Sequence, residues 1–271
     1  MNDPKTWGEG TAPTRFTQAQ NTHGNTLESA RETTHAASLC AQIKHIAERI
    51  ADAAHTGTHA AKETHILAVS KTVTAERLRL AYTCGLCTFG ESYLQEARPK
   101  QEALSDLDIE WHFIGPVQAN KTRPLAEHFA WVHSVDRLRI AERLSQQRPA
   151  HLPALNVCLQ VNIDHEPSKA GVLPEELPAL AHSVAALPRL KLRGLMAIPR
   201  PSDDPDEQAD SFRRVRLLQE NLLREGLALD TLSMGMSDDL EAAVAQGATW
   251  VRIGTAIFGA RPTPPLKSTI K

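Results

Sequence analysis

The sequence predicts a parallel (β/α)8 TIM-type barrel, preceded by an N-terminal helix and by a disordered N-terminal extension. Short apolar, β-branched segments alternate with longer stretches of helical period, and these apolar segments number eight. Several of them are continuously apolar, which is typical of parallel strands buried on both faces. A doubly wound open sheet is the competing prediction, because a count of strands does not prove that the sheet closes.

The beginning of the chain differs in composition from the rest. Residues 1–34 are rich in Thr, Asn, Gln, Gly and Glu and have no apolar period, so we expect a disordered extension there. The next stretch carries apolar residues at helical spacing, namely Leu39, Ile43, Ile46 and Ile50. This helix is expected to end before Gly57. His55 and His59 flank that glycine without an HExxH pattern, and we interpret them as a solvated surface pair.

The rest of the chain alternates between strands and helices. Strands are expected at Ile66–Ser70, Thr88–Gly90, Ile109–Ile114, Trp131–His133, Leu155–Asn162, Leu190–Ile198, Leu229–Ser233 and Trp250–Ile253. Helices are expected at Glu76–Tyr82, Tyr93–Leu104, Arg137–Gln146, Glu175–Leu187, Asp206–Glu225 and Leu240–Gln246. Since no Gly- or Ser-rich linker interrupts the alternation, residues 35–265 are expected to form a single domain.

Composition and charge exclude several classes of protein. The chain has 271 residues, with 30 Lys and Arg against 32 Asp and Glu. This balance argues against a nucleic acid or an anionic membrane as the main partner. No apolar run approaches the roughly 18 residues that a membrane-spanning helix needs, and the N-terminus lacks the apolar segment of a secretory signal.

The cysteines favour the cytoplasm. Four are present, at positions 40, 84, 87 and 158, which is too few for a disulfide framework at this length. Cys84 and Cys87 have CxxC spacing, but no second pair or histidine stands at zinc-ligand spacing. We therefore interpret both as ordinary small apolar residues.

Lys71 is the first candidate for chemistry. In a barrel the functional residues lie at the C-terminal ends of the strands, and Lys71 comes directly after the first one. Desolvation at the edge of an apolar interior lowers the pKa of an amine, as a Schiff-base lysine requires. The alternative is a lysine that extends from the strand end into water.

The loops after the seventh and eighth strands are candidates for a phosphate site. Ser237 precedes two acidic residues, as an N-cap does, and its hydroxyl could bind an anion or simply cap the helix. Gly254 and Thr255 allow the backbone to approach an anion closely. Arg252, on the last strand, could donate to a ring nitrogen or pair with a carboxylate. An amine and a phosphate cradle together suggest pyridoxal 5′-phosphate (PLP), or a sugar-phosphate aldolase that uses a Schiff base without a cofactor.

Six segments carry a resemblance to a known family. They are Leu67-Ala-Val-Ser-Lys71-Thr, Phe89-Gly-Glu-Ser-Tyr93, Trp111-His-Phe-Ile-Gly-Pro116 with Gln118-Ala-Asn-Lys121, Arg193-Gly-Leu-Met-Ala-Ile-Pro199, Met234-Gly-Met-Ser-Asp-Asp239 and Val251-Arg-Ile-Gly-Thr-Ala-Ile-Phe-Gly259. In order and spacing, from about residue 39 to 261, the chain resembles the pyridoxal phosphate homeostasis protein family. That family is similar in fold to the N-terminal barrel of alanine racemase and lacks the second domain of that enzyme.

The resemblance implies roles for individual residues. Lys71 would form the internal aldimine with PLP, and Arg252 would face its pyridine nitrogen. Ser237, Gly254 and Thr255 would hold the phosphate.

Three more positions belong to the implied pocket. Met234 and His112 would line it. Ser92 stands where the family usually has an asparagine close to the cofactor, so a shorter side chain is expected to loosen or rehydrate the pocket there.

The resemblance implies a protein that carries or buffers PLP, with PLP-dependent enzymes as cofactor acceptors and a monomeric state. An amino-acid racemase that uses the same Lys71 is the alternative. Racemisation needs acid–base groups on both faces of the substrate. The chain has only Tyr82 and Tyr93 and no second domain to supply another tyrosine. The aldolase remains a third possibility, which an absorbance spectrum would separate from the other two.

Overall fold

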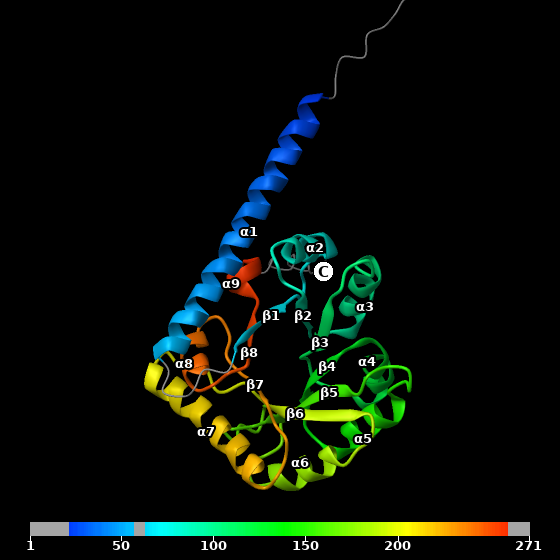
Figure 1. Cartoon of the computed structure of the whole chain (residues 1–271), viewed down its shortest axis with the longest axis vertical. Coiled ribbons are helices and arrows are strands. Elements are labelled where there is room, and N and C mark those ends of the chain that lie inside the picture. The colour runs from blue at the N-terminus through cyan, green and yellow to red at the C-terminus, as the bar shows by residue number, and fades with distance from the viewer. Residues whose placement is uncertain (1–21, 57–62, 260–271) are drawn as a thin grey trace, which may run out of the picture.

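The computed structural model of the protein describes residues 22–56, of which 22–35 and 56 by their backbone alone, and residues 63–259. Eight parallel strands follow one another around a closed barrel, and helices surround it (Figure 1). The last strand pairs with the first from His65↔Trp250 to Ala68↔Ile253. This pairing closes the sheet, which excludes the doubly wound alternative.

All eight predicted strands are present with boundaries close to those expected. They are β1 (His65–Val69), β2 (Thr88–Glu91), β3 (Glu110–Phe113), β4 (Trp131–Val135), β5 (Leu155–Val161), β6 (Leu190–Ala197), β7 (Thr231–Ser233) and β8 (Trp250–Ile253). Their continuously apolar character is explained by burial on both faces, since helices cover the barrel outside and side chains fill it inside.

The helices follow the same alternation. They are α1 (Thr22–Thr56), α2 (Ala75–Thr83), α3 (Leu94–Ala103), α4 (Thr122–His128), α5 (Leu138–Gln147), α6 (Leu177–Ala185), α7 (Pro205–Arg224), α8 (Leu240–Ala245) and α9 (Thr255–Phe258), with a 3₁₀ turn η1 (Ala119–Lys121) before α4. Sequence periodicity did not predict α4 and α9, because seven and four residues are too few to show a helical period.

Helix α1 begins earlier than expected. It starts at Thr22, so residues 22–34, which we expected to be disordered, are helical, while residues 1–21 lie outside the described residues. The C-terminal half of α1 packs against α2, α8 and α9 (Figure 1). Its buried side chains are Leu39, Ile43, Ile46, Ile50 and Ala53. The tertiary contacts of this half therefore fix α1 beside the C-terminal helices of the barrel.

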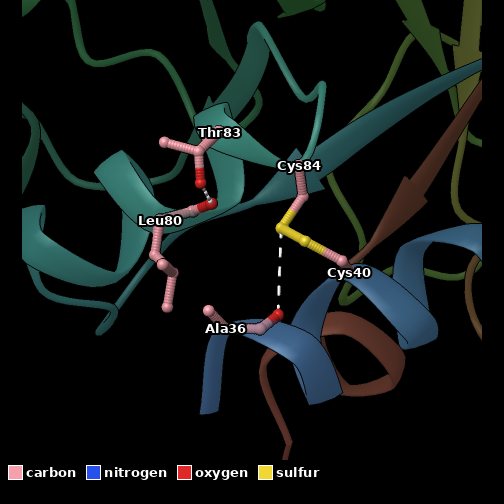
Figure 2. The surroundings of a disulfide bond; sticks show 5 residues. All are labelled: Ala36, Cys40, Leu80, Thr83 and Cys84. Atoms are coloured by element: carbon pink, nitrogen blue, oxygen red, sulfur yellow. Dashed lines mark hydrogen bonds between the residues drawn. A yellow bond between two sulfur atoms is a disulfide. The ribbon is translucent and has the colours of Figure 1, made fainter. Parts of the chain in front are cut away.

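The prediction that Cys84 is an ordinary small apolar residue is wrong. Cys40 and Cys84 form a disulfide that joins α1 to the C-cap of α2 (Figure 2). They lie 44 residues apart in sequence, so the CxxC spacing gave no signal of this pairing. Cys87 is an exposed free thiol, and Cys158 is a buried one.

Two further expectations concern metals and membranes. His55 is bonded through Nδ1 to the backbone oxygen of Ala51 at 2.6 Å, and its neighbour His59 lies outside the described residues. Across residues 22–56 and 63–259, no helix has the length and apolar character to cross a bilayer.

Candidate functional site

A cavity of about 620 Å³ opens at the C-terminal ends of the strands. Six residues that the sequence indicated lie in its wall, namely Lys71, Ser92, Ser237, Arg252, Gly254 and Thr255. The structure therefore brings together side chains that are up to 184 positions apart in the chain, counting from Lys71 to Thr255.

Lys71 lies in a strained turn at the end of β1. The turn is closed by a hydrogen bond from the Val73 N–H to the Ser70 oxygen at 3.0 Å. Thr72 has φ of 65°, in the left-handed region that a β-branched residue rarely adopts, at a cost of about 1–2 kcal/mol. The Glu96 carboxylate accepts from the Thr72 N–H at 2.9 Å and holds this conformation. Strain of this kind is often stored at functional sites, and here it carries the lysine into the cavity wall.

A buried ion pair supports the backbone next to Lys71. The Lys100 ammonium donates to the Ser70 oxygen at 2.8 Å and to Glu91 Oε1 at 2.7 Å. The Ser70 hydroxyl donates to the same Glu91 oxygen at 2.6 Å. Burial raises the pKa of the Glu91 carboxyl, while Lys100 and Ser70 oppose that rise. Because Ser70 and Glu91 immediately precede Lys71 and Ser92, the cluster fixes the ends of β1 and β2 relative to each other.

Arg252 forms the floor of the cavity. Its side chain is buried, and its guanidinium donates to the backbone oxygens of Ser233 at 2.6 Å and Ala197 at 2.9 Å. These oxygens belong to the last residues of β7 and β6. Desolvation lowers the pKa of Arg252 to about 10, so it keeps its positive charge at neutral pH. The floor is thus a fixed cationic donor.

Ser237 is not the helix cap that the sequence suggested. Helix α8 has Asp239 as its N-cap residue, and Asp239 Oδ1 accepts from the Met236 N–H at 2.5 Å. Ser237, Gly254 and Thr255 all line the cavity. Helix α9 begins at Thr255, and the N–H groups of Ile257 and Phe258 donate to the Gly254 oxygen, so in the described structure only those of Thr255 and Ala256 lack a backbone acceptor in this helix. The hydroxyl groups of Ser237 and Thr255 and these two N–H groups are therefore donors in residues that line the cavity.

The backbone conformation at Gly254 does not require a glycine. Its φ is −116°, which any residue adopts. A Cβ added there would lie 3.4 Å from the Val69 Cβ, at ordinary contact distance, so the protein itself leaves room for a small side chain. What glycine provides is space in the cavity wall beside the first turn of α9.

The sequence did not predict two arginines of the cavity wall. Arg49 comes from α1, donates to Glu241 at 2.6 and 2.9 Å and reaches the Ser237 backbone oxygen at 3.2 Å. Arg77 comes from α2 and lies 5.8 Å from the ring centre of Phe258. No motif marks either position, because each helix brings its arginine to the cavity only after folding. With Lys71 and Arg252 they give the wall four cations against the single carboxylate of Asp238, which favours an anionic ligand.

Met234 and His112 do not line the cavity, contrary to expectation. Met234 is fully buried in the hydrophobic core, and Met236, two positions later, lies in the wall instead. His112 is also fully buried, deeper in the barrel, where its ring stacks on Trp131 at 5.3 Å. The loop after β7 turns at Gly235, whose φ is 91°, and sequence order alone does not show which methionine then faces the cavity.

Neither tyrosine lies in the cavity wall. Tyr93 precedes α3 with 55% of its surface exposed, and Tyr82 is half-buried on α2. Among the described residues that line the cavity there is no Tyr and no His. The wall thus offers one amine, Lys71, and no tyrosine or histidine as a second acid–base group.

The comparisons with known proteins agree on one family. Residues 27–262 match the family model described as alanine racemase, N-terminal domain. The pyridoxal phosphate homeostasis protein of Pseudomonas aeruginosa is 60% identical over 223 residues, covering 82% of this chain and 96% of that protein. Its namesake from Escherichia coli K12 is 50% identical, with 81% and 95% covered. The structure of PipY from Synechococcus elongatus with PLP bound is 40% identical with a TM-score of 0.70, covering 79% of this chain and all of that one.

Proposed function

Because this chain belongs to the pyridoxal phosphate homeostasis protein family, we propose that it binds PLP in the cavity at the barrel mouth and carries or buffers that cofactor. The observation that carries the proposal is the meeting of Lys71, Arg252 and the Ser237–Thr255 side in one cationic cavity. PipY, at 40% identity, has been solved with PLP bound. The aldolase without a cofactor has no such support.

The residues present fit the chemical groups of PLP. When bound, PLP supplies an aldehyde that forms Schiff bases with amines, and Lys71 is the amine of the wall. Arg252 lies at the floor as a donor for the ring nitrogen, which it would keep unprotonated and so make the ring a weaker electron sink. Ser237, Thr255 and the first N–H groups of α9 are donors for the phosphate, with Gly254 giving access.

Reversible binding of PLP explains the site better than amino-acid racemisation does. A racemase needs two positioned acid–base groups, each typically contributing about 10²–10⁴-fold to the rate. Lys71 is one, and the described wall contains no tyrosine or histidine to act as the other. We therefore propose reversible attachment of PLP at Lys71 without useful turnover. Incubation of the PLP-loaded protein with L-alanine in heavy water tests this. Steady formation of deuterated D-alanine, lost in Lys71→Ala, would establish the racemase instead.

PLP-dependent enzymes are the proposed acceptors of the cofactor, and the protein is proposed to act as a monomer. Met236 and Ile198, in the cavity wall, are 40% and 38% exposed, so the mouth is open to exchange. The test is reactivation of an apo-aminotransferase by the PLP-loaded protein, with free PLP at equal concentration as the reference. Transfer no faster than spontaneous release of PLP would contradict direct delivery.

The binding unit is proposed to span residues 35–265, with residues 1–34 dispensable for PLP binding. Among the described side chains of α1, from Ala36 to His55, the buried ones run from Leu39 to Ala53, so the part of the helix after residue 35 supplies buried contacts to the binding unit. A protein that starts at His35 is expected to bind PLP with unchanged affinity, and a clear loss would contradict the boundary.

The proposed compartment is the cytoplasm, where thiols are kept reduced, so Cys40 and Cys84 are expected there as a dithiol. Thiol alkylation in intact cells followed by peptide mapping tests this. Recovery of the intact disulfide would contradict it.

A further inference from the structure

A continuous chain of side-chain hydrogen bonds runs through the barrel interior to Arg252. Glu110 Oε1 lies 2.9 Å from His112 Nε2, and His112 Nδ1 lies 2.9 Å from His133 Nε2. His133 Nδ1 lies 2.8 Å from the Ser233 hydroxyl, which lies 3.1 Å from Arg252 Nη1. Glu110 is the first residue of β3, and Arg252 forms the cavity floor. The chain therefore connects one end of the barrel with the other.

The carboxylate end fixes the direction of every bond, because burial keeps both rings neutral at neutral pH. The Glu110 carboxylate can only accept, so His112 donates to it from Nε2 and accepts at Nδ1. His133 therefore donates from Nε2 to His112 Nδ1 and accepts at its own Nδ1 from the Ser233 hydroxyl. The lone pairs of that hydroxyl accept from the Arg252 guanidinium, which can only donate. Each neutral ring thus carries its proton on Nε2.

The surroundings support this assignment. Both histidines are fully buried, and burial lowers the pKa of His112 and lowers that of His133 well below its ordinary value. The hydrogen bond from His112 lowers the pKa of Glu110, so the far end is an anion at neutral pH.

The charged and titratable groups near the chain lie on several elements. Arg193 on β6 lowers the pKa of Glu110 and is paired with Asp230. Asp239, in the loop after β7, and the buried thiol of Cys158, on β5, both raise the pKa of Arg252. The ring of His65, on β1, contacts that of Trp250. None of them is an acceptor for the protons of the chain in the described structure.

We propose that Glu110, His112, His133 and Ser233 are positioning residues that hold the Arg252 guanidinium at the cavity floor through this one-way chain. With its proton committed to His133, the Ser233 hydroxyl presents only lone pairs to Arg252. A reversed chain would use one lone pair of that hydroxyl for His133, release its hydrogen and leave a single lone pair for Arg252. The orientation of the cationic floor thus depends on a carboxylate at the opposite end of the barrel. The inference rests on the proposed function only in that Arg252 faces the ring of PLP.

The first measurement needs no cofactor. Side-chain ¹⁵N NMR of histidine-labelled protein reports which ring nitrogen carries the proton. Wild type is expected to show the Nε2–H form alone for His112 and His133. Glu110→Gln is expected to shift both rings toward a mixture of tautomers, because an amide can donate to His112 Nε2 as well as accept from it. Its matched control is Glu63→Gln, at an exposed position just before β1. The matched control for Ser233→Ala is Ser134→Ala, which removes a buried hydroxyl of β4 that donates to the Gly115 oxygen outside the chain. If either ring shows the Nδ1–H form in wild type, or if Glu110→Gln leaves both tautomers unchanged, the chain does not exist as described.

The second measurement links the chain to the cavity. Ser233→Ala is expected to raise the Kd for PLP about three- to tenfold, the effect of one lost hydrogen bond, and to shift the pH midpoint of the absorbance of bound PLP. Glu110→Gln keeps an acceptor but removes the charge, and a rise of about two- to threefold is expected. Glu63→Gln removes an exposed carboxylate just before β1 and is its control.

The two measurements separate the possible failures. If the tautomers respond but both PLP readouts match those of Ser134→Ala, the chain does not position Arg252 and the proposal is overturned, while PLP binding stands. If borohydride fixes no PLP on wild-type protein, the proposed function fails, and the NMR comparison in unloaded protein alone decides whether the chain orders the floor. Should Ser233→Ala not fold, Glu110→Gln against Glu63→Gln provides the same pair of readouts.

Discussion

At the C-terminal mouth of the barrel, Lys71, Ser92 and Ser237 are partly exposed, whereas in the interior beneath them His112, His133 and Trp131 are buried. Every ring nitrogen of the two histidines has a hydrogen-bond partner, and their rings pack against Trp131 and Trp250. The mouth instead combines a strained turn at Thr72 with an excess of cations. The interior joins its polar groups to one another in hydrogen bonds, whereas the mouth gathers cationic groups around a cavity.

The difference between the two regions predicts where stability resides. Trp131→Ala, in the buried region, is expected to lower the free energy of unfolding by about 3–5 kcal/mol, since it removes a large buried side chain and leaves a cavity. Tyr93→Ala, at the exposed rim, is expected to change it by less than about 0.5 kcal/mol. Urea unfolding of both variants measures this. Equal losses would mean that the rim is as tightly packed as the interior.

The disulfide adds a third region outside the barrel, because it joins α1, the helix that carries Arg49, to the C-terminal end of α2. Cys40→Ser is expected to lower the free energy of unfolding by about 2–4 kcal/mol relative to oxidised wild type, because the unfolded chain loses a cross-link across 44 residues. Cys87→Ser, which removes an exposed free thiol, is the control. If reduction of wild type leaves its unfolding midpoint unchanged, the cross-link contributes nothing to stability.

The two buried histidines, His112 and His133, predict that the free energy of unfolding depends on pH. Their folded pKa values lie below the ordinary value of 6.5, so below pH 6.5 the unfolded state binds protons that the folded state does not. Stability is therefore fully present above pH 6.5 and falls as the pH decreases toward the folded pKa values. The loss approaches about 1.4 kcal/mol per pH unit for each ring.

Unfolding measured between pH 7.5 and 5 tests this window. His133→Gln is expected to flatten the slope, while His151→Gln, at an exposed position, keeps it. A slope that is unchanged in His133→Gln would contradict the assignment to the buried rings.

The smallest expected effect concerns the mouth. Ser237→Ala is expected to weaken PLP binding by about 1–2 kcal/mol, because backbone donors and Arg49 remain near the lost hydroxyl. The free energy of unfolding without PLP is expected to stay nearly constant. Titration with PLP and with pyridoxal separates the phosphate contribution. If pyridoxal binds as tightly as PLP, this side of the cavity does not hold the phosphate.

The sequence predicted the barrel because several strands are buried on both faces and are continuously apolar, and because strands and helices alternate along the chain. It also predicted Lys71, Ser92, Ser237, Arg252, Gly254 and Thr255 as neighbours, because parallel strands bring their C-terminal ends to one face.

The misses have a common cause, since each depends on the position of an element outside the strand pattern. Arg49 and the Cys40–Cys84 bond depend on where α1 packs, and the choice of Met236 over Met234 depends on the turn at Gly235. Local sequence patterns do not predict where such elements pack.

Reduction of the PLP-loaded protein with borohydride, followed by peptide mapping, identifies the amine that holds PLP. We expect a single pyridoxyl label on Lys71, because that amine lies in the cavity wall at a strained turn. Lys71→Ala is expected to lose the label and keep its unfolding midpoint. Two other lysines serve as internal controls and are expected to stay unlabelled. Lys169 forms an ion pair with Glu166 at 2.7 Å, and Lys121 lies on η1. A label found mainly on either of them, or retained in Lys71→Ala, would contradict attachment of PLP at Lys71.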